Sequence, residues 1–299
     1  MMKHYWALVE VPNDNENPIS FVIKLRSGCR FKLNNCYFTI YKSWYNEFHN
    51  SDYFRIDLVI DADEKHAENV MRRSIDLLVY ITGVPYELDY LREDIDINIQ
   101  PINMNMSKEK LSRLALIDAQ YNRTRHKKEL LENVLRLYSL ATKYMILLED
   151  SEEAYFAMFR VIEKIAKDEF GIEHGNVDNG FSVTRSMINN LTQNIYGVKF
   201  TSNKLDDLAG NFSATLKDMV FSDIYAKIAW FCGRKNIFFD EGVLSRAVKL
   251  RNKHAHGDNV HIDNRSREYD LVLELATKFI YEKFFCNLKH CYLEAKMDI

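Results

Sequence analysis

A short polar run late in the sequence contains the side chains that proton transfer to and from a phosphate ester requires. The run is Arg251-Asn252-Lys253-His254-Ala255-His256, and Gly257 follows it. Arginine presents a planar fork of N–H donors to a phosphate. Histidine is the side chain whose charge changes near neutral pH, so it can take up or release a proton. Asparagine adds an uncharged donor that can orient a substrate or the imidazole.

The spacing of three of these residues predicts that they act together. Asn252 and His256 are four positions apart and so share one face of a helix, with Arg251 one residue to the side. At a helix end the three side chains could converge on one anion. This set suffices for RNA transesterification, in which a deprotonated 2′-hydroxyl attacks phosphorus, the 5′-oxygen leaves protonated and a cation stabilises the phosphorane. No metal or other cofactor is expected.

One histidine per chain cannot easily serve as both the base and the acid of this reaction. A symmetric dimer that places two copies of the run across a cleft supplies both. The sequence therefore predicts a homodimer or a higher homo-oligomer that acts on RNA.

The sequence resembles the HEPN superfamily at two places. Arg251-Asn252-x-x-x-His256 resembles the R-x4-6-H signature, with the polar residue that follows the arginine in the nucleases. The segment Glu153–Ala166 is similar to the second helix of the HEPN bundle, where an aromatic-rich face leads to a glutamate. Gly257 and the β-rich first third are similar to the ApeA-like branch. The resemblance covers roughly residues 130–285.

This resemblance implies a four- or five-helix bundle that dimerises and cuts RNA without a metal, often as a toxin or an antiviral (abortive infection) effector. Arg251 and His256 carry over as catalytic residues, and Asn252 as the polar residue beside them. Glu163 carries over as an acidic residue that faces the motif, and Lys253 and His254 are supporting candidates. The segment Gly171–Asn236 is longer than a minimal bundle needs.

Three other interpretations of the same residues stay open. Cationic side chains at a helix C-terminus are favoured by the helix dipole alone. A HEPN fold could also bind RNA or a partner without cutting. Finally, His254-x-His256-x-Asp258-x-x-His261 resembles the H-x-H-x-D-H metal signature of metallo-β-lactamase-like hydrolases, and imidazoles with a carboxylate could hold zinc. Two features oppose zinc, since the last histidine is displaced and the pattern follows a helix instead of a strand.

Two further groups of residues have both a functional and a structural interpretation. The basic run Arg123–Lys128 is typical of a solvated helix face, or it contacts RNA. Trp6, Trp44 and the neighbouring tyrosines form the core of a small sheet, or they stack on bases.

The first third of the chain, which holds all four prolines, contains the strand-like segments. Short aromatic and β-branched stretches predict strands at Tyr5–Val11, Ile19–Leu25, Arg30–Leu33, Tyr37–Tyr41 and Tyr53–Ile60. Ser27-Gly28 and Asn34-Asn35 are predicted turns. A helix is expected over Glu64–Ile81, and 88–99 either returns to the sheet or connects two domains.

After Ser107 the apolar spacing is helical. Ser151 is expected to cap a helix that Gly171 ends, and Asp240 one that passes Leu250. Other helices are expected over Phe181–Tyr196, Leu216–Phe231 and from about Asp263 to Lys296. The predicted fold class is α+β, with a β-rich N-terminal domain (1–103, a possible sensor or regulatory module) before a helical HEPN-like domain (107–299).

Composition sets the broad class. A hydrophobic content of 47% with 28% charged residues is typical of a globular protein, and the net charge of −3 excludes a generally basic nucleic-acid coat. The five cysteines include no C-x-x-C pair, which suits free thiols in a reducing cytoplasm. We expect no signal peptide and no membrane span, and hence a cytoplasmic protein.

Overall fold

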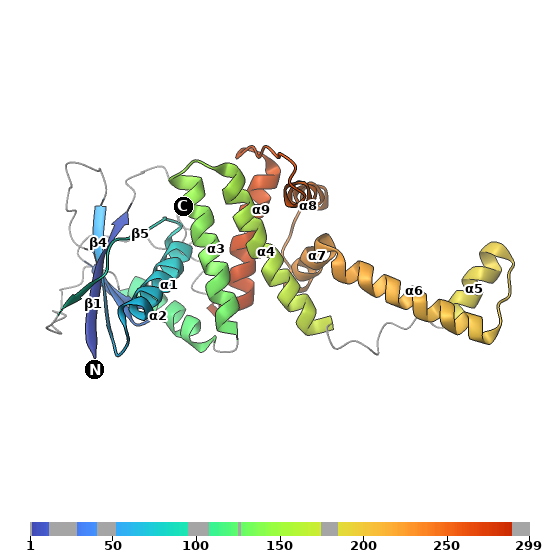
Figure 1. Cartoon of the computed structure of the whole chain (residues 1–299), viewed down its shortest axis with the longest axis horizontal. Helices are drawn as coiled ribbons and strands as arrows, with labels where there is room; N and C mark the ends of the chain where they lie inside the picture. The colour runs from blue at the N-terminus through green and yellow to red at the C-terminus, as the bar shows by residue number, and fades with distance from the viewer. Residues whose placement is uncertain are drawn as a thin grey trace. The chain divides into compact units, whose positions relative to one another are not determined.

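The computed structural model describes residues 2–11, 29–40, 52–94, 108–124, 127–174 and 185–288. The chain forms two compact units, one of Met1–Ile162 with Lys253–Ile299 and the other of Glu163–Asn252. Figure 1 labels the helices and strands of both units.

An antiparallel sheet in the order β2-β3-β4-β1-β5 opens the first unit, and β6 also pairs with β1. Its strands are β1 (Lys3–Val11), β2 (Cys29–Leu33), β3 (Cys36–Ile40), β4 (Asp52–Ile60), β5 (Glu87–Leu88) and β6 (Arg92–Asp94). β1 and β4 pair along their whole length, from Lys3 opposite Ile60 to Val11 opposite Asp52. Asn34 and Asn35 form the β2–β3 turn with φ of 46° and 67°, a left-handed conformation that asparagine tolerates. This predicted turn is confirmed.

The sheet buries alternate residues against helices. Tyr5, Ala7 and Val9 of β1 are fully buried, as the period of two in a strand requires. Helices α1 (Glu64–Thr82) and α2 (Lys108–Arg123) pack on the sheet. Gly83, at φ 69°, ends α1 as a left-handed C-cap.

Helix α1 also belongs to a helical core that continues from the sheet. It packs against α3 (Lys128–Ile146), which contacts α9 (Arg267–Ile280). The Tyr80 hydroxyl donates to the Thr277 carbonyl oxygen at 3.3 Å, and the Tyr138 hydroxyl lies 3.4 Å from Thr277 Oγ1. The rings of Tyr80 and Tyr138 meet edge to face with centroids 5.4 Å apart. Three helices therefore meet at buried hydroxyl contacts.

Helix α4 (Ser151–His174) begins and ends differently from the prediction. The cap is Asp150, whose Oδ1 accepts the N–H of Glu153 at 3.0 Å, and Ser151 is already helical. A carboxylate is as good a cap as a hydroxyl, so the preceding residue could take this role. The helix also continues through Gly171 to His174, because a glycine inside a helix costs only about 1 kcal/mol.

The second unit contains α5 (Arg185–Tyr196), α6 (Ser202–Ser222), α7 (Ile224–Lys235) and most of α8 (Glu241–Ala255). The prediction of one helix over Leu216–Phe231 was wrong. Asp223 interrupts it, since its side chain accepts the N–H of Ala226 at 3.1 Å and caps a new helix. By contrast, the predicted Asp240 cap is confirmed, with Oδ1 accepting the Val243 N–H at 3.0 Å.

The last helix is shorter and less regular than predicted. Asp263 accepts the N–H of Arg265 at 2.9 Å in a local turn, and Ser266 caps α9 through the N–H of Tyr269 at 3.2 Å. After α9 follow a π-turn, η2 (Tyr281–Phe285), and a 3-10 turn, η3 (Cys286–Leu288). The remainder of this predicted helix lies outside the described residues.

The α+β class is confirmed, with a small antiparallel sheet before a mainly helical remainder. The predicted strand Ile19–Leu25, the turn at Ser27-Gly28, Trp44 and the expected boundary at 103–107 lie outside the described residues. The division into domains 1–103 and 107–299 stays a prediction, and the two compact units divide the chain elsewhere. Among the described helices, none is long and apolar enough to cross a membrane.

The contacts of Tyr138 predict a large stability effect. Replacing this side chain, which is 1% exposed, in Tyr138→Ala should lower the free energy of unfolding by about 3–5 kcal/mol, because a cavity forms where α1, α3 and α9 meet. Leu140→Ala is the control, since Leu140 lies on the same helix and is 41% exposed. Denaturant unfolding would measure both; equal small losses would contradict this account of the core.

Candidate functional site

Helix α8 positions the first residues of the predicted motif. Leu244, Ala247 and Val248 are buried along one side of it, which places Arg251 and Asn252 in its last turns. The helix ends at Ala255, and Gly257 adopts a left-handed φ of 83°. The N–H of Gly257 donates to the His254 carbonyl oxygen at 2.9 Å. The helix therefore ends just before Gly257.

Arg251 forms a two-pronged ion pair with Glu163 of α4. Its Nε donates to Glu163 Oε2 at 3.1 Å, and its Nη2 lies 2.6 Å from Oε1 and 2.7 Å from Oε2. Its Nη1 donates to Asn252 Oδ1 at 3.2 Å. The guanidinium plane is thus fixed by two partners. Both belong to the same compact unit as Arg251.

Glu163 is a buried carboxylate that cations keep charged. Its exposed fraction is 8%. Burial alone would raise its pKa, but hydrogen bonds from Lys167 and Arg251, together with their charges, outweigh burial and hold the pKa below its ordinary value. Lys167, one turn along α4, contacts Glu163 Oε1 directly.

A third cation lies close enough to act on this group. Lys227 of α7 is buried, and burial together with the positive charge of Lys167 lowers its pKa, while Glu163 and Asp223 act in the opposite direction. Arg251 and Lys167 therefore contact Glu163, and the charges of Glu163 and Asp223 also act on Lys227. This local excess of positive charge suits a phosphate group, even though the chain as a whole is slightly acidic.

The remaining motif residues belong to the other compact unit, because the boundary falls between Asn252 and Lys253. There His254 stacks on the ring of Phe156, with centroids 3.7 Å apart and planes 14° apart, and its Nδ1 lies 3.7 Å from Glu152 Oε1. Lys253 and His256 are exposed. His254 therefore packs against an aromatic ring, and His256 is accessible to a substrate.

The zinc interpretation finds no geometric support. His254, His256, Asp258 and His261 are all described, yet no three histidine, cysteine, aspartate or glutamate side chains among the described residues are grouped to hold a metal ion. The pattern in the sequence therefore does not form a cluster among the described residues, and His254 stacks on Phe156 instead.

Lys128 of the basic run is only half-exposed. Its Nζ lies 3.1 Å from the centroid of the Tyr121 ring and donates to the Tyr121 carbonyl oxygen at 3.2 Å. Burial lowers its pKa to about 8. Arg125 and His126 lie outside the described residues.

In the sheet, Tyr5 is buried in the core, and the Trp6 ring has Arg55 and Arg92 within 4.4 Å and 4.7 Å of its centroid. The two guanidinium groups lie over the Trp6 ring, so less of the ring surface remains for a base to stack on.

No family model, curated protein or solved structure matches the chain. The resemblance to HEPN domains rests on the two sequence segments quoted above. Sequence reasoning placed Glu163 opposite Arg251, and the structure pairs them. It missed Lys167 and Lys227. The i, i+4 spacing of Glu163 and Lys167 was a usable signal for the first, whereas Lys227 comes from a distant helix.

Removing the buried carboxylate should destabilise the Glu163–Asn252 unit. Glu163→Gln should lower the free energy of unfolding at pH 7 by about 1–3 kcal/mol, because Arg251 and Lys167 lose their anionic partner. A lowered folded-state pKa means that this stabilisation is present above the ordinary glutamate pKa of 4.5. It is lost as the pH falls through the folded-state value.

The measurement is denaturant unfolding of both proteins from pH 7 down to pH 3. The difference between them should shrink toward the acid end. Glu153→Gln, an exposed glutamate on the same helix, is the matched control and should change stability little. A difference for Glu163→Gln that stayed constant across this range would show that the ion pair contributes nothing.

Proposed function

We propose that this protein is a metal-independent endoribonuclease of the HEPN type. The observation that supports it most is the Arg251 guanidinium, fixed by Glu163 and Asn252 at the polar end of α8 among further cations. His256 follows four residues after Asn252 and is exposed. These are the groups that phosphoryl transfer within RNA needs.

Each residue has a definite role in the proposed reaction. The guanidinium has five N–H donors, so those not engaged by Glu163 and Asn252 remain for the scissile phosphate. Arg251 stabilises the phosphorane charge, with Lys167 and Lys227 adding positive potential. His256 takes the proton from the 2′-hydroxyl, and in a second copy it protonates the leaving 5′-oxygen. Glu163 acts through Arg251 as a positioning residue.

The proposal includes assembly and context. The chain acts as a homodimer on RNA, because one copy provides a single histidine for two proton transfers. A toxin or antiviral effector that works in the cytoplasm is the role that the HEPN resemblance implies. The alternative is a HEPN-fold protein that binds RNA or a partner without cutting, in which the Glu163–Arg251 pair only stabilises the fold.

Substituting the exposed histidine separates these functions. His256→Ala should reduce cleavage of total RNA about 100- to 10,000-fold, the usual contribution of a general acid–base, while folding and RNA affinity are kept. His261→Ala is the control, since His261 is also exposed and belongs only to the zinc interpretation. Gel analysis in the presence of a strong chelator measures both. Cleavage that disappears in chelator, or that is lost equally in His261→Ala, would contradict the proposal.

Dimerisation makes a separate prediction about concentration. If a complete site needs two copies, cleavage per molecule should rise with protein concentration and level off where the dimer saturates. Initial rates would be compared with the mass of the protein in analytical ultracentrifugation over the same concentrations. A monomer with constant activity per molecule would contradict the two-copy site, although not the fold.

A further inference from the structure

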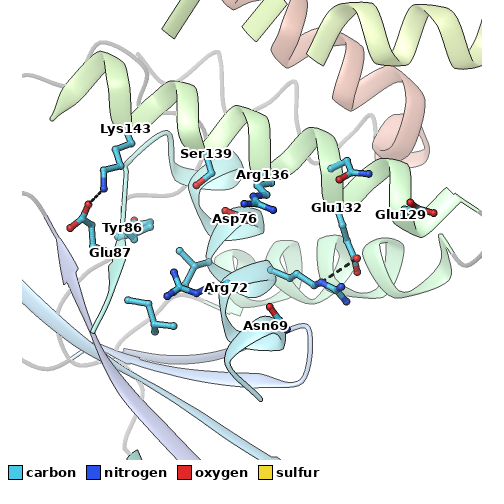
Figure 2. A pocket seen from close by; sticks show the side chains of 14 residues that line it. Asn69, Arg72, Asp76, Tyr86, Glu87, Glu129, Glu132, Arg136, Ser139 and Lys143 are labelled. Atoms are coloured by element: carbon cyan, nitrogen blue, oxygen red, sulfur yellow. Dashed lines mark hydrogen bonds and ion pairs between the residues drawn. The ribbon is translucent and has the colours of Figure 1, made fainter. Parts of the chain in front are cut away.

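A polar cavity in the first compact unit is lined by none of the residues of the α8 motif. It has a volume of about 770 Å³ and is formed by α1, α3 and the segment around β5. Figure 2 shows its lining side chains pointing from these elements toward one another. The charged residues that line it include Arg72, Asp76, Glu87, Glu132, Arg136 and Lys143. Its size is within the range of small-molecule sites, roughly 300–1,000 Å³.

Asp76 lies on the α1 wall between Arg136 and Ser139 of α3 (Figure 2). Burial raises the pKa of its carboxyl to about 6, although a hydrogen bond with Ser139 and the charges of Arg136 and Arg72 lower it. The protein partners of this carboxylate therefore offset only part of the cost of removing it from water. A ligand that donates hydrogen bonds would offset the remainder.

The cations of the cavity differ in how they are paired. Arg73 lies 3.2 Å from Glu132, Lys143 contacts Glu87, and Arg72 donates to Glu68 at 2.6 Å. Arg136 has no hydrogen bond or ion pair with any described residue, although its charge acts on Asp76. Its guanidinium fork is thus available to an oxyanion from outside the protein.

The cavity lining also includes apolar side chains. These belong to Ile75, Tyr86 and Leu88. The Tyr86 hydroxyl donates to Thr82 Oγ1 at 3.0 Å, which fixes the orientation of the ring. The aromatic ring of Tyr86 offers a surface against which a planar heterocycle can pack.

We propose that this cavity binds a mononucleotide. Arg136, with Arg72, binds the phosphate; Asp76 and Ser139 accept and donate hydrogen bonds with the sugar or the base edge; and the base packs beside Tyr86. The lining complements three features of a ligand: an oxyanion, hydrogen-bond donors and a planar apolar group. A nucleotide has all three. This inference does not depend on the proposed RNA cleavage.

Isothermal titration calorimetry on the full chain tests the proposal. The probes are the four ribonucleoside monophosphates, the corresponding nucleosides and inorganic phosphate. At least one nucleotide should bind with a dissociation constant below 1 mM, at least about tenfold more tightly than its nucleoside or phosphate, since both recognise only part of the cavity. Phosphate binding equal to nucleotide binding would overturn the proposal, as would no nucleotide binding up to several millimolar.

Variants locate the binding. Arg136→Ala and Asp76→Asn should each weaken nucleotide binding at least about tenfold, the loss expected for one charge-assisted hydrogen bond. Both should fold, since Arg136 is exposed and Asp76→Asn removes a carboxylate that burial disfavours; thermal melting checks this. Arg160→Ala, at an exposed arginine of α4 that does not line the cavity, is the matched control.

Arg251→Ala separates this site from the proposed nuclease site. Nucleotide binding should be unchanged in Arg251→Ala. Unchanged nucleotide binding in Arg136→Ala would overturn the inference. Loss of binding in Arg251→Ala alone would also overturn it, because the nucleotide would then bind at the proposed nuclease site.

Discussion

A glutamate that is almost removed from water holds Arg251 in place within the Glu163–Asn252 unit. A buried carboxylate lowers the stability of the fold unless cations and hydrogen-bond donors contact it. Two guanidinium nitrogens of Arg251 donate hydrogen bonds to Glu163. The ammonium group of Lys167 also contacts Glu163. Because these contacts tie the end of α8 to α4 within this unit, the position of Arg251 is set by the need to neutralise Glu163. Asn252 is the next residue along α8, and its Oδ1 accepts a hydrogen bond from Arg251 Nη1.

The pKa values of two carboxylates in this protein, the buried Glu163 and the partly buried Asp76, are shifted in opposite directions. For Glu163, hydrogen bonds from two cations outweigh burial, and its pKa is lowered. For Asp76, a serine and two arginines do not outweigh burial, and its pKa rises to about 6. The first carboxylate is satisfied by the protein and serves to hold an arginine. The second is left under-satisfied in an open cavity, as is typical of a group that awaits a ligand.

The sequence predicted those features that depend on neighbours along the chain. The aromatic and β-branched stretch Tyr5–Val11 predicted a strand, and Asn34-Asn35 predicted a turn. Where two neighbouring residues can both cap a helix, the prediction can choose the wrong one. For α4, Ser151 was predicted as the cap, but Asp150 caps the helix. The helix break at Asp223 was missed because the apolar spacing around it continues on both sides.

Features made by distant segments were harder to predict. Glu163 and Arg251 are 88 positions apart, and their proximity followed only from the HEPN resemblance. The cavity around Asp76 was not predicted at all. Its polar lining comes from two helices whose side chains, taken one helix at a time, are typical of a solvated face. Only the packing of α1 against α3 places Asp76 beside Ser139 and Arg136.

The chemistry of the RNA ends would test the central claim most directly. If Arg251, Asn252 and His256 catalyse attack by the 2′-hydroxyl, the products carry 2′,3′-cyclic phosphate and 5′-hydroxyl ends, which mass spectrometry of a short defined RNA can identify. The account predicts these ends in the presence of chelator, and their absence when Arg251→Ala replaces the intact protein. Products with 3′-hydroxyl and 5′-phosphate ends, or no cleavage by the intact protein, would contradict it.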